Sequence, residues 1–160
     1  MIAVLQFGCG KHAEMLDMSQ DHHQHRCNLF GYKYIQEREQ KTSHPIWEKS
    51  RMVLNALKEG MDVVWIDADA VWVQGDIGDP IRMFSGISMA YHHYDEHGPH
   101  FNAGVMFIRN TRETIEAVQE WIETPVIDEI WVDQVSLNHV ATRVPNLFRR
   151  VGHEWNSVEW

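Results

Sequence analysis

Short runs of consecutive apolar residues alternate along the chain with segments in which apolar and polar residues are mixed. Apolar runs of this length are typical of strands buried on both faces, as in parallel sheets, and three of them lie at 2–7, 63–66 and 103–109. Three mixed segments place apolar residues on one side at helical spacing and stop at Gly or Pro; they cover 14–30, 45–59 and 110–124. The alternation predicts an α/β fold, a three-layer sandwich around a mostly parallel central sheet.

Length and composition indicate an ordinary globular domain. The chain has 160 residues, of which 44% are apolar and 23% charged, so we expect a single domain over 1–160 with a sizeable core. Its 14 basic and 23 acidic residues give a net charge of −9. Without a basic surplus, neither nucleic acid nor an anionic membrane surface is expected as a partner. No apolar stretch approaches the roughly 18 residues of a membrane span.

Two features bear on localisation. Cys9 and Cys27 are the two cysteines, too few for a disulfide framework. The apolar segment 2–7 is too short for a signal peptide and is interpreted as a first strand. We therefore expect a cytoplasmic protein whose thiols stay reduced.

The strand predicted at 63–66 runs directly into two acids one residue apart, Asp67 and Asp69. In extended backbone these side chains point the same way. Two carboxylates about 4 Å apart repel by a few kcal/mol at an effective dielectric near 20, and a divalent cation with its preference for carboxylate oxygen relieves that repulsion. Because open α/β sheets bind ligands at the carboxyl ends of their strands, the pair predicts a metal site that serves a phosphate.

Five segments carry a further pattern in their order and spacing: Cys27–Tyr32, His44–Lys49, Trp65–Ala70, Phe101–Thr111 and Asp133–Asn138. Together they resemble the type A glycosyltransferases, which combine an Asp-x-Asp motif with a nucleotide-sugar donor. The retaining α-galactosyl, mannosyl and xylosyl transferases and the glycogenin-like enzymes are the most similar groups. The resemblance covers nearly the whole chain and implies a compact version of that fold that is short at the C-terminus.

The resemblance implies metal-dependent transfer of a sugar, with retention, from a UDP- or GDP-linked donor to a hydroxyl of a glycan, lipid or protein. Asp67 and Asp69 would hold Mn²⁺ or Mg²⁺. The catalytic residues would be Asp133, which binds sugar hydroxyls, and Gln134, which lies near the anomeric carbon and stabilises charge. The donor-binding residues would be Phe7, Gly8, Lys49, Asp67, Asn102, Ala103 and Gly104.

The chain departs from this family near its C-terminus. Related enzymes place a metal-binding histidine after a Trp/Tyr-Asn segment, and no histidine follows Trp155-Asn156 here. His153 is the candidate replacement for that third metal ligand.

Histidines are frequent in two other segments. The polar segment 91–100 contains four of them and is predicted to be a loop that closes over the donor. In segment 21–25, His22 and His25 have the helical spacing of a chelating pair, but we interpret the segment as a solvated polar face.

Two other functions fit the same acids. In a phosphohydrolase of the haloacid dehalogenase type, Asp67 would be the nucleophile and Asp69 the acid. A sugar-nucleotide-binding domain without catalytic activity is the second alternative.

Overall fold

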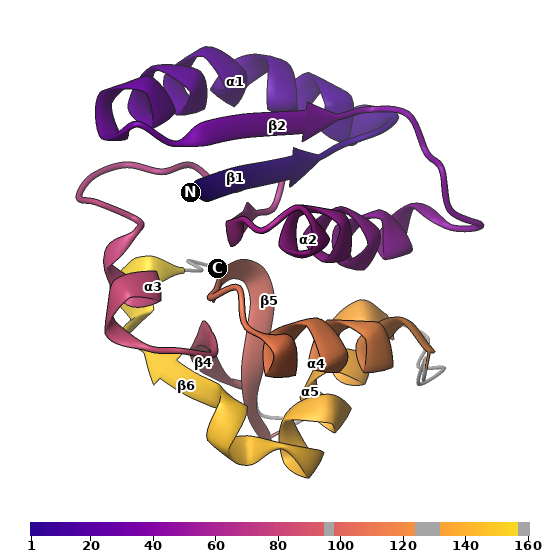
Figure 1. The fold of residues 1–160 in the computed structure, drawn as a ribbon. Coiled ribbons are helices and arrows are strands. Elements are labelled where there is room, and N and C mark those ends of the chain that lie inside the picture. Colours follow the sequence, from indigo (N-terminus) through magenta and orange to yellow (C-terminus); the bar gives the residue numbers. More distant parts are fainter. Residues whose placement is uncertain (95–97, 124–131, 157–160) are drawn as a thin grey trace.

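A mixed sheet runs through the part of the chain that the computed structural model describes, residues 1–94, 98–123 and 132–156. Within these ranges the sheet has six strands in the order β2-β1-β3-β5-β4-β6 (Figure 1). Their bounds are β1 Ile2–Phe7, β2 Lys33–Glu37, β3 Asp62–Ile66, β4 Ile87–Tyr94, β5 Gly98–Ile108 and β6 Phe148–Val151. The strands predicted from the three apolar runs are therefore confirmed as β1, β3 and part of β5.

Helices cover both faces of the sheet, as predicted for a three-layer sandwich. Their bounds are α1 Lys11–Phe30, α2 Glu48–Lys58, α3 Asp79–Met83, α4 Arg112–Glu123 and α5 Val132–Arg143, with short 3-10 helices at η1 Pro45–Trp47, η2 Pro145–Leu147 and η3 His153–Trp155. One core forms where α2, α4 and α5 pack together on one face, as Figure 1 shows. A second core lies on the other face, where Cys27 of α1 and Ile81 of α3 are buried. No helix in the described ranges has both the length and the apolarity to cross a membrane.

Strand direction brings two distant parts of the chain to one edge. β1 pairs in parallel with β2 and β3, and β4 with β6, whereas β5 runs antiparallel to β3 and β4. The sheet is thus mostly but not purely parallel. Because Ile66 at the end of β3 pairs with Val105 of β5, the acids that follow β3 come to lie beside residues 102–104.

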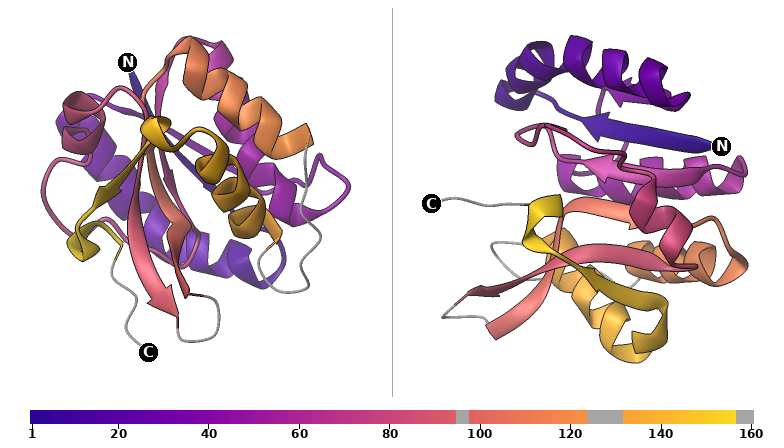
Figure 2. Two further views of the ribbon diagram at one scale, coloured as in Figure 1. Left: turned by 90° about the horizontal axis from the view of Figure 1, so that it is seen from below. Right: turned by 90° about the vertical axis from the view of Figure 1, so that its left-hand side faces the viewer.

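The prediction of a loop over 91–100 is wrong. β4 continues through Tyr94 and β5 begins at Gly98, with His92 paired to His100 across the two strands. Tyr91 and Phe101 also pack edge to face, with ring centroids 5.1 Å apart, and such cross-strand pairs stabilise a hairpin despite its polar sequence. Figure 2 shows these strand ends extending beyond the rest of the sheet. The part of the predicted loop at 95–97 lies outside the described residues.

The histidine segment of α1 is also not a uniformly solvated face. His22 and His25 are exposed, but the side chain of His23 is fully buried. The backbone N–H of Trp72 donates to His23 Nε2 (3.0 Å), so Nδ1 carries the proton and donates to Gln6 Oε1 (2.8 Å). Burial, helped by the neighbouring His22, lowers the pKa of His23 from 6.5 to about 4. The ring is therefore neutral in the folded protein near pH 7.

We predict that His23 makes the fold less stable in acid. The unfolded chain takes up a proton at this side chain below about pH 6.5, whereas the folded chain resists it down to about pH 4. The contribution is complete above that window and is lost as pH falls through it. Urea unfolding should show a free energy of unfolding about 2 kcal/mol lower at pH 4.5 than at pH 7 from this residue.

His23→Gln should lose this part of the pH dependence, whereas His25→Gln, an exposed change on the same helix, should keep it. The same pH slope in His23→Gln and the unchanged chain would contradict a buried neutral His23.

Candidate functional site

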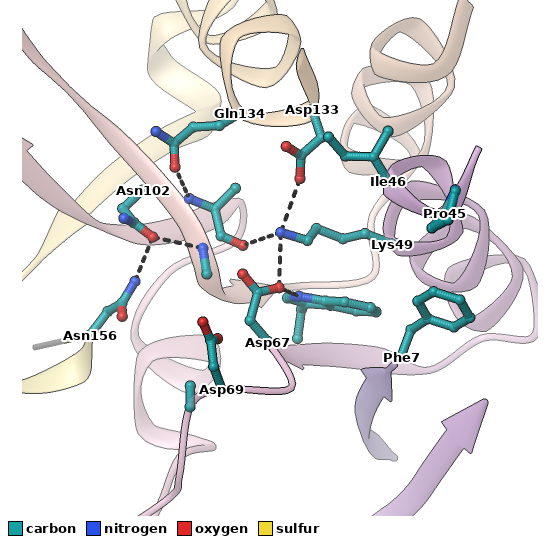
Figure 3. Close-up of a pocket in the computed structure, with 14 residues that line it drawn as sticks. Phe7, Pro45, Ile46, Lys49, Asp67, Asp69, Asn102, Asp133, Gln134 and Asn156 are labelled. Atoms are coloured by element: carbon teal, nitrogen blue, oxygen red, sulfur yellow. Dashed lines mark hydrogen bonds and ion pairs between the residues drawn. The ribbon is translucent and has the colours of Figure 1, made fainter. Parts of the chain in front are cut away.

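A cleft of about 410 Å³ opens where β1 and β3 end (Figure 3). Most of the residues predicted from the sequence line it: Phe7, Lys49, Asp67, Asp69, Asn102, Ala103, Gly104, Asp133 and Gln134. They come from β1, α2, the loop after β3, the strand β5 and the first turn of α5. The structure therefore brings these residues together, while the role of each stays a prediction.

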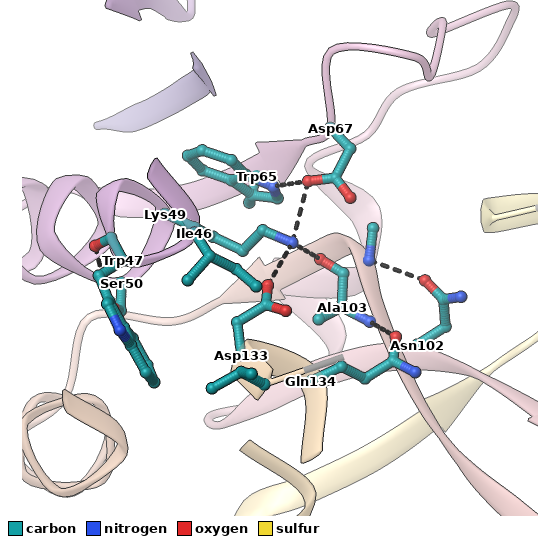
Figure 4. A network of polar contacts seen from close by, with 12 residues as sticks. Ile46, Trp47, Lys49, Ser50, Trp65, Asp67, Asn102, Ala103, Asp133 and Gln134 are labelled. Carbon is teal, nitrogen blue, oxygen red and sulfur yellow. Dashed lines mark hydrogen bonds and ion pairs between the residues drawn. The ribbon is translucent and has the colours of Figure 1, made fainter. Parts of the chain in front are cut away.

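Lys49 lies at the centre of the cleft wall (Figure 4). Its ammonium group is 3.0 Å from Asp67 Oδ1 and 3.0 Å from Asp133 Oδ2, and it donates to the carbonyl oxygen of Ala103 at 3.1 Å. An ammonium group has three N–H donors, so all of them are used within the protein. Lys49 therefore has no N–H donor left for a ligand in this arrangement, and its predicted donor-binding role stays a prediction.

Burial and the attraction between opposite charges shift the pKa of Lys49 and of Asp67. Burial alone lowers the pKa of Lys49, but the attraction of Asp133 and Asp67 outweighs it and raises that pKa above the ordinary lysine value. Burial raises the pKa of Asp67, with Lys49 and the hydrogen bond from Trp65 acting in the opposite direction. The lysine is therefore charged near pH 7, and it compensates carboxylates that are costly to bury.

Asp67 and Asp69 lie in the loop 67–72, here called the acid loop. The strand ends at Ile66, and a turn closed by a hydrogen bond from Ala70 N–H to the Asp67 carbonyl (3.0 Å) replaces the extended backbone expected there. Both side chains nevertheless line the cleft, on the same side of it in Figure 3. Oδ1 of Asp67 accepts from Trp65 Nε1 at 2.6 Å as well as from Lys49, which leaves Oδ2 as its outward oxygen.

The oxygens of the acid loop suit a hard divalent cation. Asp69 is exposed and, within the described part of the chain, pairs with nothing. The same part of the chain holds no group of three His, Cys, Asp or Glu side chains that could enclose a metal ion. Mg²⁺ is commonly bound through one or two carboxylates together with substrate phosphates and water. Asp67 Oδ2 and Asp69 fit that mode of binding better than a site made of protein ligands alone.

Residues 102–104 of β5 form the opposite wall. Gly104 N–H and Asn156 Nδ2 both donate to Asn102 Oδ1, each at 2.7 Å. Gln134 Oε1 accepts the backbone N–H of Ala103 at 3.0 Å, so its amide NH₂ is the group left for a ligand. A Cβ atom on Gly104 would stand 2.9 Å from Asn102 Oδ1 and 3.4 Å from Asp67 Oδ2, which explains a glycine at this point.

Five residues that line the cleft were not among the predicted ones: Pro45, Ile46, Trp65, Ala70 and Asn156. Two of them, Trp65 and Asn156, hold a predicted residue in place. Trp65 holds Asp67 through its indole N–H, and its position two residues earlier on the same strand face was a usable signal. Asn156 lines the cleft and donates to Asn102. It belongs to the Trp-Asn segment noted in the sequence, but only the fold brings it to β5.

Gly8 is predicted to bind the donor but is not among the described residues that line the cleft. Gly8 is buried under α1, where an added Cβ would lie 2.6 Å from the carbonyl oxygen of His12, so close packing accounts for its lack of a side chain. The side chain of His153 is not among those that the structure describes. Its metal-binding role stays a prediction.

Comparison with known proteins bears on both fold and family. The sequence model of a family described as nucleotide-diphospho-sugar transferase matches residues 13–147. An uncharacterized protein of Arabidopsis thaliana is 23% identical over 78 residues, which are 49% of this chain and 23% of that protein. The chain therefore spans less than a quarter of that relative's length.

Two solved structures have similar folds. One is a glycosyltransferase involved in the glycosylation of the major capsid of PBCV-1, with a TM-score of 0.71 and 16% identity over 95% of this chain and 82% of that one. The other is the glycosyltransferase GlyE of Streptococcus pneumoniae TIGR4, with a TM-score of 0.62 and 18% identity over 96% of this chain and 46% of that one. At these identities the likeness shows the fold alone, and it agrees with the predicted architecture.

We predict that Lys49→Met is strongly destabilising, because the carboxylates of Asp67 and Asp133 would lose the cation between them. The free energy of unfolding in urea should fall by about 3 kcal/mol, the low end for a buried pair that loses one partner. Adding Asp133→Asn should restore about 1 kcal/mol or more, since one of the unpaired charges is then gone.

Lys41→Met is the matched control, because Lys41 pairs with Glu37 at the surface and should cost less than about 1 kcal/mol. If Lys49→Met were as mild as this control, the central role of Lys49 in the site would be wrong.

Proposed function

The chain belongs to the nucleotide-diphospho-sugar transferase family, and from that premise we propose that it transfers a sugar from a nucleoside-diphosphate donor to a hydroxyl group with the help of a divalent cation. The observation that carries the proposal is the convergence of two outward acids, Asp67 and Asp69, with Asp133 and Gln134 in a single cleft. Family membership supports sugar transfer itself. The metal, the donor nucleotide and the retention of configuration are proposed here and do not follow from family membership.

Asp67 Oδ2 and Asp69 would hold Mn²⁺ or Mg²⁺ against the diphosphate. The cation supplies Lewis acidity that stabilises the departing nucleoside diphosphate. The chain's contribution is to hold the two acids in place and to limit their repulsion, since Lys49 and Trp65 engage the other oxygen of Asp67.

Asp133 and Gln134 would act on the donor sugar. Asp133 gives one oxygen to Lys49, and its second oxygen would accept hydrogen bonds from sugar hydroxyls. Gln134 is held by Ala103 N–H through its oxygen, so its NH₂ group would donate to the sugar or to the oxygen that leaves the anomeric carbon. A side-chain amide is a weak nucleophile, so this residue would orient groups and stabilise charge in a reaction that retains configuration.

The apolar side of the cleft suits the base of the donor. Phe7, Pro45 and Ile46 line it, and the aromatic ring of Phe7 would stack on a uracil or guanine ring. The donor would be a UDP- or GDP-linked hexose or pentose, and the acceptor a hydroxyl of a glycan, lipid or protein. A cytoplasmic location, suggested by the two free cysteines Cys9 and Cys27, stays part of this proposal.

Family membership favours sugar transfer over phosphohydrolysis of the haloacid dehalogenase type. In that alternative Asp67 would attack a phosphorus atom, although one of its oxygens accepts hydrogen bonds from both Lys49 and Trp65. The other alternative is a domain that binds a sugar nucleotide without turnover, and it differs from an active transferase in that it consumes no donor.

We predict that UDP or GDP stabilises the protein only in the presence of Mn²⁺. At a nucleotide concentration of about 100 times Kd, the melting temperature should rise by about 5–10 °C. Asp69→Ala should abolish this rise in a thermal-shift experiment, because half of the outward carboxylate pair is lost.

Asp21→Ala, which removes an exposed acid of α1, should keep the full rise. A metal-dependent rise that survives in Asp69→Ala would remove this residue from the metal site.

We predict that Gln134→Glu separates binding from turnover. The glutamate keeps an oxygen for Ala103 N–H but loses the NH₂ donor and adds a negative charge near the sugar. Consumption of the nucleotide sugar, measured by release of nucleoside diphosphate, should fall by about 100-fold, while the stabilisation by UDP and Mn²⁺ remains. If the unchanged chain binds UDP but consumes no donor with any acceptor, it is a binding domain.

A further inference from the structure

Buried polar side chains of β1 and α1 hold the backbone of the acid loop in place. Gln6 Nε2 donates to the carbonyl oxygen of Asp67, the first residue of the loop, at 3.3 Å. Gln6 lies on β1 and its side chain is fully buried. Because the same carbonyl also accepts the turn-closing N–H of Ala70, the start of the loop is determined by both a local and a distant donor.

The last residue of the acid loop is held by the same helix that supports Gln6. Trp72 N–H donates to His23 Nε2 at 3.0 Å, and the carbonyl oxygen of Trp72 is 2.6 Å from His22 Nε2. His23 is buried on α1, and its Nδ1 donates to Gln6 Oε1 at 2.8 Å. A continuous path of hydrogen bonds therefore joins the two ends of the loop through Gln6 and His23.

The orientation of the Gln6 amide follows from this path. Its oxygen accepts from His23 Nδ1 and from the hydroxyl of Tyr34 at 2.6 Å, so its NH₂ group must face Asp67. Tyr34 contributes to this orientation without touching the loop itself. Buried polar groups that are fully paired specify one arrangement, since any other would leave a donor or acceptor unpaired.

We propose that Gln6 and His23 are positioning residues that set the spacing of Asp67 and Asp69 and thereby the affinity of this pair for a divalent cation. The inference rests on the proposed function, because it takes the two acids as the metal ligands. Neither side chain touches the cation; both act on the backbone that carries the ligands. Residues behind metal ligands typically change metal affinity by 10–100-fold when they are lost.

Mn²⁺ binding measured by electron paramagnetic resonance tests the inference directly, since the signal of free Mn²⁺ disappears on binding. Gln6→Met keeps the size of the side chain but removes the donor to Asp67 together with the acceptor of His23 and Tyr34. His23→Leu removes the acceptor for Trp72 N–H. Each should weaken Mn²⁺ binding by about 10-fold, with and without UDP.

Two matched variants separate positioning from general stability. Tyr34→Phe also deletes a hydrogen bond to Gln6 Oε1, a partly buried one, but leaves the loop contacts intact. Its Mn²⁺ affinity should therefore stay within about twofold of that of the unchanged chain. His23→Gln restores an acceptor for Trp72 N–H and should recover most of the affinity that His23→Leu loses. Melting temperatures, recorded on the same samples without metal, should fall for Tyr34→Phe and Gln6→Met alike.

The outcomes distinguish this inference from the function on which it rests. If the unchanged chain binds no Mn²⁺, the metal assignment is wrong and the positioning role with it. If the unchanged chain binds Mn²⁺ and Gln6→Met binds it equally well, only the positioning role is wrong. Should His23→Leu fail to fold, the comparison of Gln6→Met with Tyr34→Phe still decides the matter. Both variants lose the Tyr34 hydrogen bond to Gln6, and only Gln6→Met also loses the hydrogen bonds of Gln6 with Asp67 and His23.

Discussion

The ammonium group of Lys49 lies between the carboxylates of Asp67 and Asp133 and also donates to the backbone of β5. Through these contacts one cation links α2, the acid loop, α5 and the central sheet. Removing two carboxylates from water is costly unless an opposite charge accompanies them. The cleft can therefore concentrate acidic groups only because a lysine compensates two of them from within the wall (Figure 4).

Lys49 neutralises only part of the negative charge in the cleft, and the charge that remains suits the site to a cation. Three acids line the cleft with one lysine, so two formal negative charges remain if all are ionised. Asp69 and the outward oxygen of Asp67 carry this remaining charge on the open side, while Lys49 and Trp65 occupy the inner side. A divalent cation would match this excess of negative charge, and Asp69 with Asp67 Oδ2 would hold it.

The mixed sheet explains why the second wall stands where it does. Because β5 is antiparallel to β3, residues 102–104 in the middle of β5 lie beside the end of β3, and Asp67 N–H donates to the Gly104 carbonyl at 2.8 Å. In this way Ala103 of β5 supplies both an acceptor to Lys49 and a donor to Gln134 from its backbone. On the other side of the acid loop, the buried pair of Gln6 and His23 is connected to the same backbone.

The sequence alone determined what depends on neighbouring residues. The apolar runs of β1 and β3 were recognisable because a strand buried on both faces needs apolar side chains at nearly every position. Asp67 and Asp69 stood out because they break the run at a strand end. The order of the motifs indicated the family and most of the residues that line the cleft.

Only the tertiary structure decided which groups meet across long separations in the sequence. It showed that all three donors of Lys49 are used within the protein and that Asn156 reaches Asn102. It also showed that His23 is buried while its neighbours on α1 are exposed, and that a histidine-rich segment forms strands. These outcomes depend on strand register and helix packing, and no local pattern of polar and apolar residues encodes which distant partner will pair with a polar side chain.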